Sequence, residues 1–385
     1  MEAILLPYNC ECAHIQGIMM NYTNAQIAPD LNKATTPISL VLLEDKTSHT
    51  TVTACKKIDK TIEIITIPPL LDSQAVHLNI GIELDEHLIH NILSEAYRNV
   101  RITEIKVQAD LDQLATRNPD LVFSGVKYFD FDGQQLWLND YLDQHGIAYM
   151  ASNRKALDGE FDKSNAKQLM QQAGLATADY FTTAPDEHRT EASIPIAFPL
   201  FVKPVAGGDS QGIDANSVVN DFESFQAKVI DIWETQHSRS LVETYLSGRE
   251  YSVGIFEDYA SGELTAMPIE IIAQKNKNGQ RILDYDIKRF DYEQVIAVKN
   301  PTIYKQLSKL AKEAFKVLNG KAFGRIDIKM NHHNSPHFME ANLMPGLRKG
   351  YFYRSCVMNL NLTYEQMILK IAKNGLTSRQ LFSRI

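Results

Sequence analysis

The chain has 385 residues, of which 44% are hydrophobic and 22% charged, a composition typical of soluble globular proteins. Its length predicts two or three domains, and its formal net charge of −8 argues against a sequence-independent nucleic-acid binder, which needs a basic surface. No apolar run approaches the length of a membrane span. The N-terminus lacks the basic segment of a signal peptide and the four cysteines are scattered, so we expect reduced thiols and a cytoplasmic protein.

Residues 1–60 offer no recognisable chemistry, although 38–45 and 51–58 have the pattern of strands. From about residue 61, strand and helix patterns alternate. The predicted strands are 62–68, 100–107, 120–125 and 147–152, and the predicted helices are 84–97, 111–118 and 133–146. Such alternation predicts a mainly parallel sheet whose ligand-binding loops lie at the C-terminal ends of the strands.

The next segments carry lysines and glycines in a suggestive order. A helix is predicted over 157–173 with Asp162 as a cap, and Lys163 and Lys167 share one of its faces, as solvated lysines also would. An apolar strand then carries Lys203 into a glycine-rich loop that contains Gly208 and Ser210. Glycine lets backbone N–H groups approach a phosphate, although a simple hairpin turn would also use it. The loop matches neither the Walker A nor the Rossmann pattern.

An amphipathic helix is predicted after residue 219, with a capping box of Asn220 and Glu223. Its expected buried stripe is Phe222, Phe225, Val229 and Trp233. Two strands follow, joined by the apolar linker Tyr245-Leu246 between Glu243 and Glu250. Such a linker suits the edge of a base and an acid beyond it suits a ribose hydroxyl, but a bend between strands with exposed acids has the same pattern.

The following strand, 265–274, is predicted to pair with 251–258, and a polar stretch then carries Lys288 and Arg289. Asn300 and Pro301 start a helix that ends before Gly320. Its expected buried residues are Leu307, Leu310, Ala314 and Phe315. The last amphipathic helix, 363–375, is predicted to pack on the C-terminal domain.

The stretch 323–346 reads as two strands joined by a polar turn, with Phe338, Glu340 and Asn342 on one face. A hairpin centred between His333 and Asn334 places Asp327 opposite Glu340 and Arg325 opposite Asn342. Carboxylate and amide oxygens are the ligands that Mg²⁺ prefers, and an arginine beside them suits a transferring phosphoryl group. A solvated hairpin with paired charges is the alternative, and a slip of one residue would separate these groups.

In this order, the segments DKSNAK, FVKP with its glycine-rich loop, LVETYLSGREYSV, DYDIK, GRID and MEANLMPGL resemble the ATP-grasp superfamily. The resemblance is strongest to the D-alanine–D-alanine ligase group and covers roughly residues 120–372. It implies an α/β fold, with α+β character in the ATP-grasp part, and an N-terminal α/β domain. The expected domains are 1–150, with an N-terminal elaboration, 151–245, and 246–385, which carries the metal site.

The resemblance also implies roles for individual residues. Lys163, Lys203 and the loop with Gly208 and Ser210 look like phosphate contacts, and Lys288 looks like a contact of the γ-phosphate. The adenine and ribose contacts would be Glu243, Tyr245, Leu246 and Glu250. The Mg²⁺ ligands would be Asp327, Glu340 and Asn342. Arg325 would contact the transferring phosphoryl group, and the Gly346 N–H would complete an oxyanion hole.

The implied reaction activates a carboxylate with ATP to an acyl phosphate, which an amine then attacks. The expected cofactors are ATP and two Mg²⁺ ions, with Mn²⁺ as an alternative. The expected partners are small amino-acid-like molecules, neither nucleic acid nor a membrane, and a second copy of the chain in a homodimer. The loop 205–213 and the segment 274–290 are candidate lids that exclude water.

The chain also departs from the group. It has Asp209 and Arg289 where those ligases have Ser and Tyr, and its Phe131-Asp132-Gly133 lacks the expected Glu. Beyond Gly346, Tyr351 stands where a serine binds the acceptor carboxylate. Arg289, Arg348, Lys349, Tyr351 and Arg354 therefore become candidate substrate residues for a different amino-acid or peptide-like pair.

Two alternatives remain at this point. One is a D-alanine–D-alanine ligase with an unusual acceptor loop, and the other is a nucleotide-binding protein without ligase activity. The presence of all the expected metal ligands and phosphate lysines argues against the second.

Overall fold

The computed structural model describes residues 56–67, 81–208, 210–276, 279–290 and 292–382. The strand predicted at 38–45 and most of that at 51–58 lie outside these residues. The chain separates into residues 1–54 and 55–385, and only the second unit is described here in structural terms. The division at residues 150 and 245 stays a prediction.

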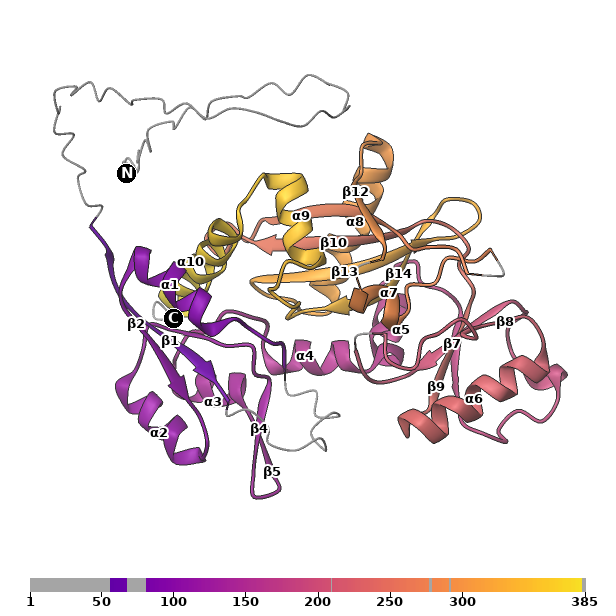
Figure 1. Cartoon of the computed structure of the whole chain (residues 1–385), viewed down its shortest axis with the longest axis horizontal. Coiled ribbons are helices and arrows are strands. Elements are labelled where there is room, and N and C mark those ends of the chain that lie inside the picture. Colours follow the sequence, from indigo (N-terminus) through magenta and orange to yellow (C-terminus); the bar gives the residue numbers. More distant parts are fainter. Residues whose placement is uncertain (1–55, 68–80, 209, 277–278, 291, 383–385) are drawn as a thin grey trace, which may run out of the picture. The chain divides into compact units, whose positions relative to one another are not determined.

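A parallel sheet of three strands in the order β2-β1-β3 opens the described chain (Figure 1). Ile62 and Ile64 face the core that contains helix α1, while Ile65 faces the core that contains α2 and α3. Helices therefore cover both faces, as parallel sheets require, and the predicted α/β pattern is confirmed. The elements are β1 (Ile58–Thr66), α1 (Glu86–Ala96), β2 (Tyr97–Glu104), α2 (Gln108–Arg117), β3 (Leu121–Phe123) and α3 (Leu138–Gln144).

Two predictions for this region are wrong. The helix expected over 133–146 begins only at Leu138, because Gln134–Trp137 is strand β5, paired with β4 (Tyr128–Phe131). Both Asp132 and Gly133 have positive φ, so this Asp-Gly pair forms the tight hairpin turn that such a dipeptide favours. The strand expected over 147–152 is reduced to one bridge between Val122 and Tyr149.

The helix predicted over 157–173 is two helices, α4 (Arg154–Phe161) and α5 (Lys163–Gln172). Asp162 lies between them, and its Oδ1 accepts hydrogen bonds from Ser164 N (2.8 Å) and Asn165 N (3.1 Å). The predicted cap is confirmed, but it interrupts the helix instead of starting it. Lys163 consequently occupies the first turn of a helix, with its side chain buried.

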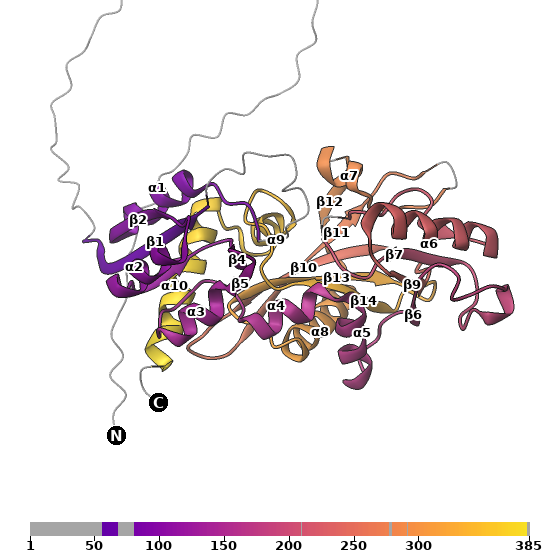
Figure 2. The same cartoon turned by 90° about the horizontal axis from the view of Figure 1, so that it is seen from below.

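An antiparallel sheet in the order β6-β9-β7-β8 comes next, and α6 packs on it through Phe225, Val229 and Ile232 (Figures 1 and 2). Asp221 caps this helix, one residue after the predicted Asn220. Trp233, predicted to be buried, is 46% exposed, because the buried stripe lies one position away on the helix. The elements are β6 (Tyr180–Thr183), the 3₁₀ turn η2 (Glu191–Ser193), β7 (Leu200–Pro204), β8 (Val218–Val219), α6 (Phe222–Gln236) and β9 (Ser240–Thr244).

An antiparallel sheet of five strands, β12-β11-β10-β13-β14, carries the C-terminal half, with α8 and α9 on opposite faces (Figure 2). A Cβ on Gly324 would meet Phe315 of α8, whereas one on Gly254 would meet Phe352 of α9. The predicted start of α8 at Asn300-Pro301 is confirmed. The elements are β10 (Glu250–Glu257), β11 (Leu264–Ile272), α7 (Tyr285–Phe290), β12 (Gln294–Ala297), α8 (Pro301–Val317), β13 (Phe323–Met330), β14 (Pro336–Asn342) and α9 (Tyr351–Leu360).

The last helix, α10 (Tyr364–Phe382), contacts α9 but packs mainly on α1 and β3. Gly375 lets it approach the Leu121 side chain, since a Cβ there would lie 2.6 Å from Leu121 Cδ1. The prediction that this helix packs on the C-terminal domain is therefore confirmed only in part: Tyr364 contacts Tyr353 and Asn374 donates to Glu257 O, but the main contacts are with α1 and β3. Amphipathicity shows that one face is buried but not which surface buries it. No helix among the described residues is long and apolar enough to span a membrane.

Candidate active site

The hairpin of β13 and β14 has the predicted pairing where it matters for chemistry. Asp327 lies opposite Glu340, and Arg325 lies opposite Asn342. The register shifts between Asp327 and Ile328. The predicted hairpin centre would pair Lys329 with Phe338, whereas Lys329 lies opposite His337 and Phe338 lies opposite Ile328. One extra residue on β14 makes this bulge, and alternation alone does not reveal it. The predicted register is correct at the carboxylate end and wrong at the turn.

Arg325 and Asp327 form a bidentate ion pair on β13. Arg325 Nε donates to Asp327 Oδ1 (3.0 Å) and Nη2 donates to Oδ2 (2.9 Å). Ser252 on the neighbouring strand β10 also donates to Asp327 Oδ1, at 2.7 Å. Burial lowers the pKa of Arg325, but the Asp327 carboxylate outweighs burial and raises it. Both side chains are thus oriented before any ligand binds.

Glu340 is the centre of a cluster of cations. Burial alone would raise the pKa of its carboxyl, yet the surrounding cations lower it to about 2. In order of effect, those cations are Lys203, Lys163, Lys288 and Arg325. Within the described part of the chain, no side chain or backbone group donates a hydrogen bond to Glu340 or to the Asn342 side chain, so these oxygens stay available to a cation.

The donor set fits Mg²⁺. Two facing carboxylates and one amide supply oxygen ligands, which suit Mg²⁺ when phosphate oxygens and water complete its shell. No group of three or more His, Cys, Asp or Glu side chains that could hold a metal occurs in the described residues. A bound Mg²⁺ at Asp327, Glu340 and Asn342 would therefore depend on its substrate phosphates.

Lys203, Glu243 and Lys167 form a buried triad that the sequence did not predict. Glu243 Oε2 lies 2.9 Å from Lys203 Nζ, and Glu243 Oε1 pairs with Lys167. Lys167 also donates to Thr177 Oγ1 at 2.7 Å, and its side chain is fully buried. The spacing of Lys163 and Lys167 on α5 was a signal for a second site lysine, but the sequence does not reveal that Glu243 lies between two lysines.

This triad changes the expected role of Glu243, because its carboxylate is occupied by two lysines. The linker Tyr245-Leu246, which follows Glu243, still has a backbone N–H that is free within the described residues and could bind the edge of an adenine base. Thr244 N donates to Asp179 O and Tyr245 N to Pro199 O, whereas Leu246 N–H has no partner among the described residues. Glu250 accepts from Lys329 Nζ (2.8 Å) through Oε2, so its other oxygen remains available to a hydroxyl.

Two adjoining cavities contain the predicted residues, and Lys288 and Glu340 line both of them. The larger has a volume of about 680 Å³, within the range of small-molecule sites. Predicted residues lining the larger one include Lys163, Gly208, Arg325, Asn342, Gly346, Arg348, Lys349, Tyr351 and Arg354. Those lining the smaller one include Lys203, Ser210, Glu243, Tyr245, Leu246, Glu250 and Asp327.

A hydrogen bond joins the two candidate lids, the loop 205–213 and the segment 274–290. Ser210 Oγ in the glycine-rich loop donates to Leu283 O (3.1 Å) in the segment 274–290. Lys163 Nζ donates to Gly207 O (2.6 Å) from below the same loop. Asp209 and the side chain of Arg289 lie outside the described residues, so their predicted roles stay predictions.

The segment after Gly346 has its own set of charged contacts. Tyr351 begins α9, its ring lies 5.6 Å from the Arg325 guanidinium carbon, and its hydroxyl donates to Glu293 (2.7 Å). Burial raises the pKa of Tyr351, with Glu293 adding to the effect. Arg348 pairs with Glu83 on the surface, and Lys349 is exposed. Glu293 was missed by the sequence analysis, because a single Glu in a polar stretch gives no signal.

Lys163 leads to a prediction on pH. Burial lowers its pKa to about 8, against the opposing pull of Glu340. Phosphate favours the protonated amine, so the affinity for ATP should fall as pH rises above about 8, by at most about tenfold per pH unit. ATP dissociation constants measured from pH 7 to pH 9.5 test this. The Lys163→Arg variant should lose the dependence because arginine stays charged; a flat wild-type profile would contradict it.

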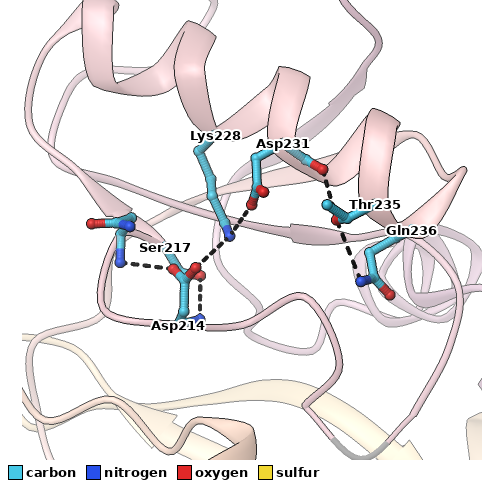
Figure 3. A network of polar contacts seen from close by, with 7 residues as sticks. Asp214, Ser217, Lys228, Asp231, Thr235 and Gln236 are labelled. Carbon is cyan, nitrogen blue, oxygen red and sulfur yellow. Dashed lines mark hydrogen bonds and ion pairs between the residues drawn. The ribbon is translucent and has the colours of Figure 1, made fainter.

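A buried lysine anchors the far end of the glycine-rich loop (Figure 3). Lys228 on α6 donates to Asp214 (3.0 Å) and to Asp231 (2.7 Å), and Asp214 in turn accepts from Asn216 N (2.8 Å). The lysine is 3% exposed, whereas both acids are about half exposed. Lys228 thus ties the end of the glycine-rich loop to helix α6.

Replacing Lys228 by Met should separate binding from stability. Asp214 and Asp231 are about half exposed, so water can solvate both acids once the lysine is gone, and the melting temperature should change little. The KM for ATP should rise by about threefold to tenfold. A loop that is less ordered in the free protein must be ordered when ATP binds, and this lowers the binding free energy of ATP. Asp231→Asn keeps the link to Asp214 and is the matched control. A lower melting temperature with unchanged KM would refute the anchor.

Comparisons with known proteins agree with this geometry. The family model "D-ala D-ala ligase C-terminus" matches residues 169–373, more than half of the chain. The D-alanine–D-alanine ligase A of Mesorhizobium japonicum is 27% identical over 251 residues, which cover 63% of this chain and 68% of that protein. The D-alanine–D-alanine ligase of Aquifex aeolicus is 29% identical over 250 residues, covering 62% of this chain and 79% of that protein.

Solved structures share the fold. The D-alanine–D-alanine ligase of Bacillus anthracis complexed with ATP superposes with a TM-score of 0.60 at 18% identity, over 83% of this chain and 99% of that one. The VanG D-Ala:D-Ser ligase of Enterococcus faecalis gives 0.57 at 18% identity, over 82% and 99%. With more than half of its length matched by the family model and the same fold over 83% of the chain, this chain belongs to the D-alanine–D-alanine ligase family of ATP-grasp enzymes.

Proposed function

We propose that this protein is an ATP-dependent ligase that joins an amino acid or peptide-like acid to an amine-bearing amino acid, releasing ADP and phosphate. The observation that carries this proposal is Glu340, opposite Asp327 and surrounded by Lys163, Lys203, Lys288 and Arg325. Such a cluster suits a triphosphate with Mg²⁺. Without a bound anion, repulsion among the buried cations would raise the free energy of the folded protein.

The reaction divides into two steps. First, an oxygen of the substrate carboxylate attacks the γ-phosphorus of ATP, the bond to the β-phosphate oxygen breaks, and ADP leaves. Lys163, Lys203 and Lys288 offset the phosphate charges, and Arg325 faces the transferring group. Bound Mg²⁺ would supply further charge neutralisation.

In the second step, the amine nitrogen attacks the carbonyl carbon of the acyl phosphate. The carbon–oxygen bond to phosphate then breaks, the amide forms, and the proton of the amine passes to solvent or phosphate. Arg325 and the Gly346 N–H would stabilise the oxyanion of the tetrahedral intermediate. The Ser210–Leu283 contact supports water exclusion, which protects the acyl phosphate from hydrolysis.

Substrate identity is the finer part of the proposal. In this chain Tyr351, bonded to Glu293, stands where the resemblance places a serine that holds the acceptor carboxylate. This favours a pair other than two D-alanines, with Arg354 as the candidate carboxylate contact. We keep two Mg²⁺ ions, a homodimer and a cytoplasmic location as predictions.

A matrix of L- and D-amino acids, assayed for ADP and phosphate release with mass spectrometry of the products, tests the function. We expect one carboxylate and amine pair to stimulate release and to yield the amide. Release with D-alanine alone would establish a D-alanine–D-alanine ligase. If no pair stimulates release while ATP with Mg²⁺ raises the melting temperature, the protein binds nucleotide without ligase activity.

A further inference from the structure

Glu293 is a buried acid with one oxygen unused. It directly precedes β12, and its side chain is 1% exposed. Its Oε1 accepts from the Tyr351 hydroxyl (2.7 Å) and lies 3.8 Å from Arg354 Nη1. Its Oε2 is buried without a hydrogen-bond partner among the described residues. Buried carboxylate oxygens are normally satisfied, so this one needs an explanation.

Glu293 lines the larger cavity together with Arg325, Tyr351 and Arg354. The Tyr351 side chain connects it to the reaction centre, because the ring lies over Arg325 and the hydroxyl reaches Glu293. The acid is therefore one side chain away from the arginine that faces the transferring phosphoryl group. A substrate atom that meets Oε2 would belong to the molecule that approaches the acyl phosphate.

The other acids of this cavity are already used. Glu83 pairs with Arg348, and Glu160 pairs with Lys127 and accepts from Leu343 N. Glu340 faces Asp327 and is surrounded by four cations. Glu340 also lacks a donor within the described chain, but it is the proposed metal ligand. Among the described residues of this cavity, Glu293 is the remaining acid with an oxygen that lacks a donor, and that oxygen is buried.

We propose that Glu293 Oε2 binds the ammonium group of the amine substrate and so selects a cationic amine. The bound group passes one proton to this carboxylate before its nitrogen attacks at the second step. The inference rests on the proposed ligase function. Tyr351 and Arg354 hold the carboxylate in place through Oε1, which leaves Oε2 without a donor among the described residues. A charge-assisted hydrogen bond from an ammonium group is stronger than one from a neutral amine, so the site discriminates between them.

Hydroxylamine provides the test, because it is uncharged at neutral pH and traps acyl phosphates as hydroxamates. Wild type and Glu293→Gln are assayed with ATP, Mg²⁺ and each amino acid as carboxylate. One series uses hydroxylamine as the amine, and a second uses the amino-acid set as amines. Glu270→Gln is the matched control, since Glu270 is a largely buried acid paired with an arginine and lines neither cavity.

In Glu293→Gln, the KM of the amino-acid amine should rise about tenfold or more, while hydroxamate formation changes by less than about threefold. Tyr351→Phe should shift the amine KM in the same direction by less. Equal losses in both series, or no change in either, would overturn the assignment and leave Glu293 as a counter-ion of Arg354. If wild type forms no hydroxamate with any acid, the ligase function itself fails, and the role of Glu293 fails with it.

Discussion

Replacing Arg325 by Lys should lower kcat by about 10³-fold, the lower end of what an arginine at a transferring phosphoryl group contributes. Lysine keeps the charge but lacks the planar fork of two nitrogens with which Arg325 holds both oxygens of Asp327, at 3.0 and 2.9 Å. The variant therefore loses both the contact with the phosphoryl group and the orientation of a metal ligand. The KM for ATP should change much less, because the proposed adenine and phosphate contacts lie on other side chains.

Arg249→Lys is the matched control for this experiment. Arg249 lies 5.7 Å from the ring of Tyr251, nearly the distance between Arg325 and the ring of Tyr351, but it lines neither cavity. Its substitution should leave kcat within about twofold, as expected for an exposed pair. Steady-state ADP release at saturating substrates measures both variants. A fall of less than about tenfold for Arg325→Lys would show that its charge alone is sufficient.

Replacing Glu340 by Gln should lower kcat by about 10²–10³-fold, comparable to the loss of one preorganised electrostatic group. The variant removes a proposed metal ligand, so half-maximal activity should also need more Mg²⁺. Glu340→Asp keeps the charge and should retain more activity at high Mg²⁺. Initial rates over a range of Mg²⁺ concentrations measure both effects. If the Mg²⁺ dependence of Glu340→Gln matches wild type, Glu340 is not a metal ligand.

The same substitution predicts an effect on stability with a defined sign. The cations lower the pKa of Glu340 from 4.5 to about 2 in the folded chain. A carboxyl whose pKa is lowered by folding stabilises the folded chain at any pH above its pKa in the unfolded chain. This contribution is lost as pH falls from about 4.5 towards 2. The melting temperature of Glu340→Gln should therefore be lower than that of wild type at pH 7. The difference should shrink at pH 4; a constant difference would contradict the charge cluster.

Local patterns predicted the strand pairing of the candidate metal hairpin and several helix starts. Alternation along 323–330 and a central turn placed Asp327 opposite Glu340, and this pairing is confirmed. Asp162, Asn300 and Pro301 predicted helix starts, because capping depends on residues within one turn. The family segments held the residues of the two cavities because each segment is short and contiguous.

The sequence by itself thus determined the fold class, the pairing within the candidate metal hairpin and the order of the candidate phosphate lysines, all of which depend on neighbouring residues or fixed strand spacing. Only the tertiary structure decided which distant groups meet. It placed Glu243 between Lys167 and Lys203, packed α10 on α1 and β3, and brought Glu293 to Tyr351 with one oxygen left over. Such contacts join residues tens of positions apart, and their energies depend on burial and dielectric surroundings that no local pattern encodes.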